Sequence, residues 1–178
     1  MSPSRSSSIA AIIVLSIAAV LLAPSAISVP NGVQGVSQGG CSCHGTTPSD
    51  SVSASIEGLP DSYNYSEEYE LTLSFVGGPS NPNNINQGGF NLWASHGTIS
   101  VLDGTAQMMG DGSASHTEAG NDQTSWTVKW TAPADDRNVD LVLHVNSVNG
   151  NAGTGQGSEG DEWNRAVAKI SGPVTVIE

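Results

Sequence analysis

The sequence has little positive charge. Its 178 residues include 5 Lys and Arg against 17 Asp and Glu, which gives a formal net charge of −12 at pH 7. Nucleic-acid binding needs a basic face for the phosphates, so we expect no nucleic-acid partner. Eight acidic residues, Asp161 among them, could supply oxygen ligands to calcium, but no segment shows the spacing of a calcium loop. We therefore expect most of the eight to be solvated turn residues on a secreted surface.

The sequence also lacks the motifs of hydrolytic enzymes. It contains no serine in a recognisable nucleophile elbow, no phosphate-binding loop and no pair of carboxylates in a cleft-forming context. We therefore expect that the protein is not an enzyme. Helical periodicity is missing after residue 28, so we also expect almost no helix in the mature chain.

One apolar run is present, at the N-terminus. Arg5 precedes the run Ile9 to Ala23, and small residues follow it as far as Ser28. The run is shorter than the roughly twenty apolar residues of a membrane span, so residues 1–28 are expected to be a secretory signal peptide. An uncleaved signal anchor is the alternative, and the membrane is then contacted through this segment only. Both readings place the rest of the chain outside the cytoplasm, at the cell surface or in the extracellular space.

Short apolar and polar alternations dominate the remaining sequence. Residues 69–75 and 126–130 show them most clearly, and turn residues recur at intervals of roughly ten positions. This pattern predicts an all-β fold: an antiparallel, Ig-like β-sandwich of seven to nine strands over residues 51–178, with an up-and-down barrel as the alternative. Residues 29–50 are expected to form a flexible segment, and Gly110 to Gln123 an exposed loop. The expected core consists of Leu71, Leu73, Phe75, Phe90, Leu92, Trp126, Val128, Trp130, Leu141 and Leu143.

The two cysteines of the chain lie in the sequence Cys41-Ser42-Cys43-His44. Two thiols followed by a histidine suit a c-type haem, held by two thioether bonds with His44 as iron ligand. They also suit thiolate and imidazole bonds to a bare copper or zinc ion. The usual haem motif is C-x-x-C-H, one residue longer, and a strained disulfide or idle thiols are the remaining readings.

A second axial ligand would have to come from elsewhere in the chain. His116 is the expected ligand because imidazole is the commonest transition-metal ligand, and His96 is a weaker choice. His144 lies on the strand face opposite Leu141 and Leu143, which predicts a surface residue. Met108 and Met109 are expected to serve in packing.

Several segments in fixed order resemble a known family. They are Gly39 to Gly45, Gly89 to Leu92, Ser115 to Gly120, Trp126 to Pro133, Val148 to Asn151 and Gly160 to Glu162. Together they resemble the secreted domain called choice-of-anchor V, which is similar to the Reeler domain of animal extracellular proteins. The resemblance covers roughly residues 36–178. It implies a secreted or cell-surface Ig-like sandwich and a haem-type Cys-x-x-Cys-His motif.

Two functions follow as expectations. In the first, the protein carries a haem at Cys41, Cys43 and His44, with His116 as the other ligand, and exchanges electrons with a redox partner. In the second, it is an extracellular binding or adhesion module whose loops 79–88, 110–123 and 147–161 meet a cell-surface protein. Asn64 begins the one glycosylation sequon, so a glycan there is plausible.

Overall fold

The computed structural model describes residues 31–36, 40–41, 44, 47–150 and 158–173. The expected signal peptide, Cys43 and the chain after Pro173 lie outside these residues. Within the described ranges, no helix has the length and apolar character needed to cross a membrane.

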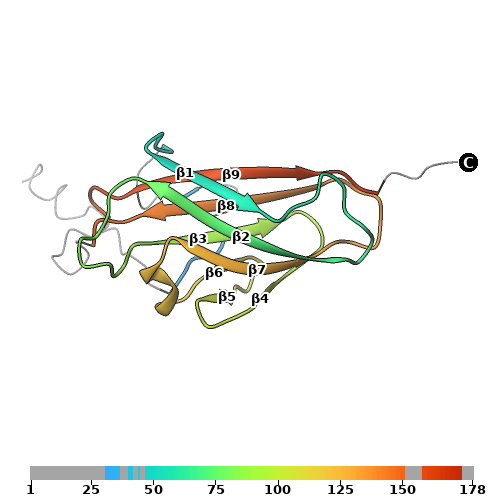
Figure 1. Ribbon diagram of the computed structural model, residues 1–178, viewed down its shortest axis with the longest axis horizontal. Helices are drawn as coiled ribbons and strands as arrows, with labels where there is room; N and C mark the ends of the chain where they lie inside the picture. The colour runs from blue at the N-terminus through green and yellow to red at the C-terminus, as the bar shows by residue number, and fades with distance from the viewer. Residues whose placement is uncertain (1–30, 37–39, 42–43, 45–46, 151–157, 174–178) are drawn as a thin grey trace, which may run out of the picture.

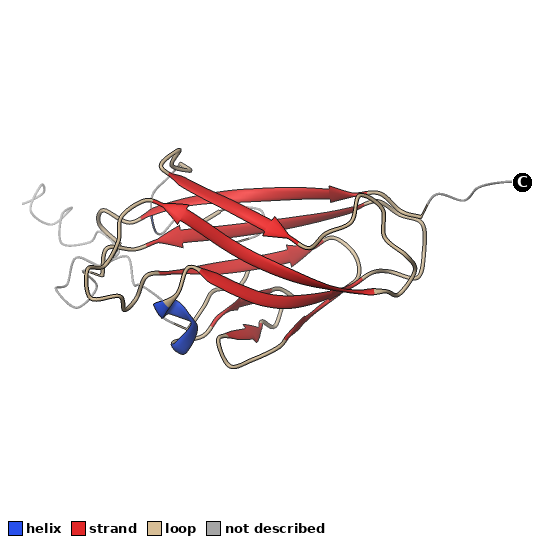
Figure 2. Ribbon diagram, viewed as in Figure 1, coloured by secondary structure: helices blue, strands red, loops and turns tan. Residues whose placement is uncertain are grey.

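In the described part of the chain, nine strands form two antiparallel sheets, so the predicted β-sandwich is confirmed (Figures 1 and 2). The four-stranded sheet has the order β1-β2-β7-β4 and the five-stranded sheet the order β5-β6-β3-β8-β9. The strands are β1 (Val52–Glu57), β2 (Glu68–Gly77), β3 (Gly88–Ala94), β4 (Thr98–Val101), β5 (Ala106–Met108), β6 (Ala114–His116), β7 (Ser125–Thr131), β8 (Val139–Ser147) and β9 (Glu162–Ile170). A 3₁₀ turn, η2 (Ala119–Asp122), lies between β6 and β7.

The core lies between the two sheets and is built by the alternation that the sequence shows. Leu71 pairs with Val128, and Leu73 pairs with Trp126, in the antiparallel register of β2 and β7. Successive residues of a strand point to opposite faces, so the odd positions of β2 and the even positions of β7 all enter the core. All ten residues of the expected core are buried.

The polar atoms of the large core side chains have backbone partners. Trp126 Nε1 donates to the carbonyl of Gly120 at 2.8 Å, and Trp130 Nε1 donates to that of His96 at 3.0 Å. The hydroxyl of Tyr63, a residue that is 1% exposed, lies 2.6 Å from one turn carbonyl and 2.7 Å from another. Such pairing removes the free-energy cost of burying these groups.

The five-stranded sheet turns its other face away from the core, and we call this its outer face. One cross-strand row on it runs Ser115, Asn91, His144 and Arg165, from β6 to β9. The next row on the same face contains Asn146 and Trp163.

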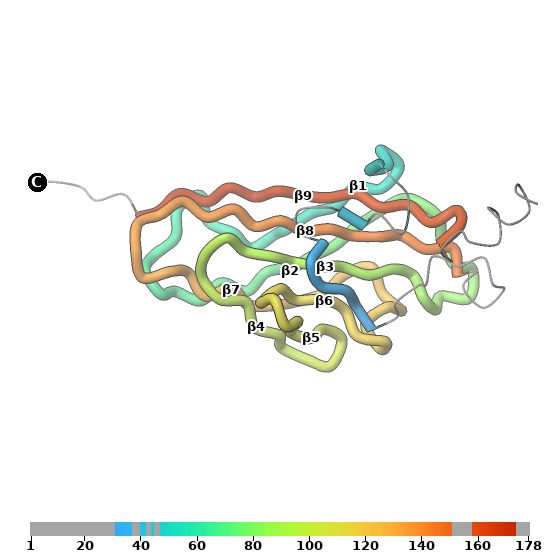
Figure 3. The backbone as a smooth tube through the Cα atoms, turned by 180° about the vertical axis from the view of Figure 1, so that it is seen from behind, coloured from blue at the N-terminus to red at the C-terminus, as the bar shows by residue number. Residues whose placement is uncertain are grey.

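Residues 31–36 cross the outer face over β3 and β6 (Figure 3). The amide of Val33 donates to Ser115 Oγ at 3.2 Å, and its carbonyl accepts from Asn91 Nδ2 at 2.8 Å. The described part of the segment expected to be flexible is thus hydrogen-bonded to the sheet.

Two expectations about exposure are wrong. Gly110 to Gln123 contains the strand β6, and Ser113, Ser115 and His116 are buried. Met108 is 41% exposed rather than packed. A short strand of alanine and serine carries no alternation that could reveal it, because its burial comes from pairing with β3 and β5.

Candidate functional site

The motif segment lies against the outer face at Gly40. This glycine has a φ of +73°, and a Cβ built on it would collide with the indole of Trp163. Only glycine therefore lets the backbone pass so close to this ring. Cys41 follows directly, and the amide of His44 donates to its carbonyl at 2.8 Å.

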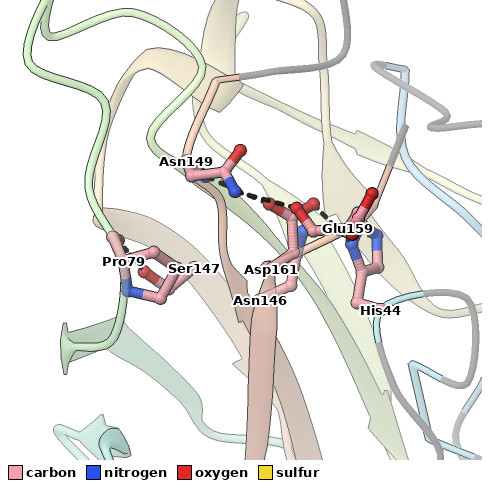
Figure 4. A network of polar contacts seen from close by, with 7 residues as sticks. All are labelled: His44, Pro79, Asn146, Ser147, Asn149, Glu159 and Asp161. Atoms are coloured by element: carbon pink, nitrogen blue, oxygen red, sulfur yellow. Dashed lines mark hydrogen bonds and ion pairs between the residues drawn. The ribbon is translucent and has the colours of Figure 1, made fainter. Parts of the chain in front are cut away.

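His44 is held by a carboxylate from the other end of the chain. Its Nδ1 lies 3.0 Å from Oδ2 of Asp161, and the two side chains are 15% and 3% exposed (Figure 4). Its other ring nitrogen, Nε2, lies 3.4 Å from the side-chain nitrogen of Asn146. A carboxylate acceptor keeps the proton on Nδ1, so the lone pair of a neutral ring is on Nε2.

Asp161 is itself fixed in place. Its Oδ1 accepts the amide of Asn149 at 3.0 Å, and Asn149 Nδ2 donates to the carbonyl of Glu159 at 2.9 Å (Figure 4). The expectation that Asp161 is a solvated turn residue is wrong, since it is buried and partners His44.

His144 lies on the outer face of β8, two residues before Asn146. The expectation of a surface residue is wrong, because His144 is 0% exposed. Burial lowers its pKa, and the charge of Arg165 lowers that pKa further. Its ring lies 5.9 Å, centroid to centroid, from the indole of Trp163, and neither ring nitrogen has a hydrogen-bond partner in the described part of the chain.

His116, the expected second ligand, lies at the end of β6. The amide of Phe90 donates to its Nδ1 at 3.1 Å. The carbonyl oxygen of Phe90 lies 3.3 Å from the same nitrogen, so Nδ1 has a backbone partner in either tautomer of the ring. The ligand role of His116 stays a prediction.

The remaining expected ligands lie elsewhere. His96 follows the end of β3 and contacts Ser95 Oγ at 3.1 Å, beside the beginning of β8, whereas His44 lies beside its end. Within the described residues, His, Cys, Asp and Glu form no cluster of three that could hold a metal ion. Cys43 is not among those residues, so the sequence motif is described only in part.

Sequence reasoning missed Asp161, Asn146 and Trp163 as neighbours of the motif. The contact of His44 with Asp161 spans 117 residues, and no local pattern carries that information. The one available signal was the segment Gly160 to Glu162, which the sequence analysis set beside the motif as part of the same resemblance.

Comparisons with known proteins give neighbours in structure only. No family model matches the chain. No curated protein matches it either. The resemblance to the choice-of-anchor V domain therefore stays a prediction.

The solved structures that the chain resembles include Reeler domains. The Reelin-N domain of F-spondin is 21% identical, with a TM-score of 0.44, over 71% of this chain and 89% of that one. The reeler domain of human F-spondin is 19% identical, with a TM-score of 0.47, over 79% of this chain and 100% of that one. With both TM-scores below 0.5, we base no functional argument on this likeness.

Proposed function

We propose that this protein is an exported β-sandwich module that carries a haem c on Cys41 and Cys43, with His44 as a ligand of the iron. The observation that carries the proposal is the pair of His44 Nδ1 and Asp161 Oδ2 at 3.0 Å. Histidines that bind metals commonly donate their other N–H to a carboxylate, which fixes the ring and raises its basicity. The motif histidine has that partner, and the partner is buried.

The chain's own residues supply attachment and orientation. Cys41 and Cys43 would hold the haem through two thioether bonds, each made by addition of the thiol S–H across one vinyl double bond, which needs no oxidant. Asp161 keeps the Nδ1 proton of His44, and Asn146 lies where the Nε2 lone pair points. The chemistry that the group would supply is one-electron transfer between a reduced and an oxidised protein partner.

A bare copper or zinc ion on the same residues is the second candidate. The observation that favours it is the tight packing of the motif segment: Gly40 touches Trp163, and His44 Nε2 is 3.4 Å from Asn146. A haem is far larger than a single ion and would have to displace these contacts. Thiolate and imidazole ligands suit copper and zinc equally well.

The first experiment is the purification of the exported full chain from a host that attaches haem to c-type motifs. A Soret band that survives acid-acetone extraction, with one iron per chain, supports the haem. Cys43→Ser should abolish covalent attachment, whereas the control Ser42→Ala should retain it. One equivalent of copper or zinc without haem supports the second candidate. A colourless, metal-free protein contradicts both the haem and the single-ion candidates. The remaining expectation is then an extracellular binding or adhesion module.

Asp161→Asn tests the carboxylate directly. Asparagine keeps the size of the side chain but removes the negative charge that strengthens the donor character of His44. The reduction potential of the haem protein should therefore rise. Asp140→Asn, at an exposed ion pair with Lys169, is the matched control and should leave the potential unchanged. Equal reduction potentials in wild type and Asp161→Asn would mean that the contact of His44 with Asp161 does not support the haem proposal.

A further inference from the structure

His144 is the most unusual polar residue of the sheet. It lies near the middle of the five-stranded sheet, in β8, with Asn91 of β3 on one side and Arg165 of β9 on the other. The side chain is 0% exposed, and neither Nδ1 nor Nε2 has a partner in the described chain. A neutral imidazole has one donor and one acceptor, and burying either of them without a partner destabilises the protein.

A second unpaired atom lies next to this ring. Asn91, the cross-strand partner of His144, donates through Nδ2 to the Val33 carbonyl and to Ser113 Oγ, which fixes the orientation of its amide. Its Oδ1 is buried without a partner in the described residues. Native proteins rarely leave such atoms unsatisfied, and a bound ion or water is a common reason when they do.

The motif approaches the sheet at the row next to His144, where Asn146 pairs with Trp163. Gly40, next to Cys41, packs on the indole of Trp163, and that indole lies beside the His144 ring. His44 contacts Asn146, which is two residues from His144 on the same strand face. The two described ends of the Cys-x-Cys-His segment therefore lie over the row that adjoins the buried imidazole.

From this juxtaposition we propose that His144 is a second imidazole ligand, besides His44, of the metal centre at the motif. The inference rests on the proposed function, since it requires a transition metal bound at the motif. If the bound group were a haem, His144 would supply a second imidazole to its iron. For a single copper or zinc ion, it completes a set of two sulfurs and two nitrogens, the composition of many tetrahedral sites.

His144 fits this role better than His116. The Nδ1 of His116 is already engaged by the backbone of Phe90, whose amide nitrogen and carbonyl oxygen lie 3.1 Å and 3.3 Å from it. The ring nitrogens of His144 have no hydrogen-bond partner in the described chain, and either can bear the lone pair.

The test uses the full-length protein purified with its bound group, and compares wild type with His144→Ala, His116→Ala and His96→Ala. In a haem protein, reduced His144→Ala should bind carbon monoxide and shift its Soret band, whereas the other two should match wild type. In a protein with a single ion, His144→Ala should bind zinc at least about 10-fold more weakly, since even outer ligands have effects of that size.

The outcomes separate the two proposals. Wild type with a bound group and His144→Ala unchanged overturns the role of His144 and leaves the proposed function standing. Wild type with neither haem nor metal overturns both. If only His116→Ala opens a coordination site to carbon monoxide, the second ligand is His116 and the proposal for His144 is overturned.

A measurement on wild type covers the case in which the His144 variant does not fold. The ¹⁵N resonances of the histidine rings are recorded for the diamagnetic form, either reduced low-spin haem or zinc. His144 should show one nitrogen at a metal-bound shift. Two ordinary imidazole nitrogens at His144, with a bound water bridging it to Asn91, would overturn the proposal.

Discussion

The strand β8 separates two buried layers with opposite properties. Leu141, Leu143 and Val145 face the core between the sheets, and His144 and Asn146 face the layer between the five-stranded sheet and the motif segment. Both layers exclude water from at least one side chain of this strand: Leu143 and His144 are each 0% exposed. The first layer is apolar and its indole and phenol groups are paired, whereas the second holds polar atoms without partners in the described chain.

The difference separates stability from function. Apolar burial in the core drives folding, at roughly 25 cal/mol per Å² of surface removed from water. The covered outer face contributes little of that kind and retains polar groups that destabilise the protein unless something binds them. Residues that are costly for the apoprotein and lie beside a ligand motif are where a binding site is expected.

The largest expected effect is in the core. Trp130→Ala removes an indole that is 0% exposed and that stacks on Tyr69, so we expect the free energy of unfolding to fall by about 3–5 kcal/mol. Val167→Ala, on the outer face at 48% exposure, should change it by less than about 0.5 kcal/mol. Urea unfolding of both variants measures the difference. Comparable losses of unfolding free energy in the two variants would show that the core and the outer face contribute equally to stability.

The next effect has the opposite sign. In protein free of haem and metal ion, His144→Leu removes two unpaired ring nitrogens and keeps an apolar side chain, so the free energy of unfolding should rise by about 1–3 kcal/mol. The same variant should lose the bound group in the loaded protein. Thermal unfolding of the apoprotein checks the gain. A marked loss would mean that the nitrogens of His144 already have partners.

Tyr63 tests the paired polar atoms of the core. Tyr63→Phe removes two hydrogen bonds to turn carbonyls and should lower the free energy of unfolding by about 1–2 kcal/mol at neutral pH. Burial raises the pKa of Tyr63. Above pH 10 the unfolded chain then loses this proton before the folded chain does, so stability falls as pH rises. The variant should show less of this alkaline loss, and Tyr65→Phe, at an exposed position, is the control.

The smallest effect concerns the docking of the motif segment. Gly40 and Gly35 both have positive φ, +73° and +77°, but an added Cβ would meet another side chain, that of Trp163, only at Gly40. Replacement of either by alanine carries a backbone penalty of about 1–2 kcal/mol. Gly40→Ala should in addition lift the segment and speed hydrogen exchange at the His44 amide, whereas Gly35→Ala should leave that amide protected. Equal exchange in both would show that the contact with Trp163 does not hold the motif in place.

The inner layer could be predicted from sequence, because the alternation of apolar and polar residues within each strand shows which residues are buried. The alternation from Tyr69 to Phe75 and from Trp126 to Trp130 was enough to identify the faces in contact. The outer layer could not. The alternation in β8 correctly placed His144 on the face away from Leu143. Whether that face is exposed to solvent depends on a segment distant in sequence that covers it, and the alternation carries no information about that segment. Asp161 and Trp163 come after β8 in the sequence. No periodic pattern connects them with Cys41, so the sequence could not place them at the site.

The pairing of His44 with Asp161 also fixes an order of assembly. A chain made from its N-terminus presents the cysteine motif first, and the carboxylate that anchors the histidine follows 117 residues later. Trp163, on which Gly40 packs, belongs to β9, the last strand in the described part of the chain. The motif segment therefore has its docking surface only once β9 is in place. Under the proposed function, attachment of a group to the thiols would come before that step.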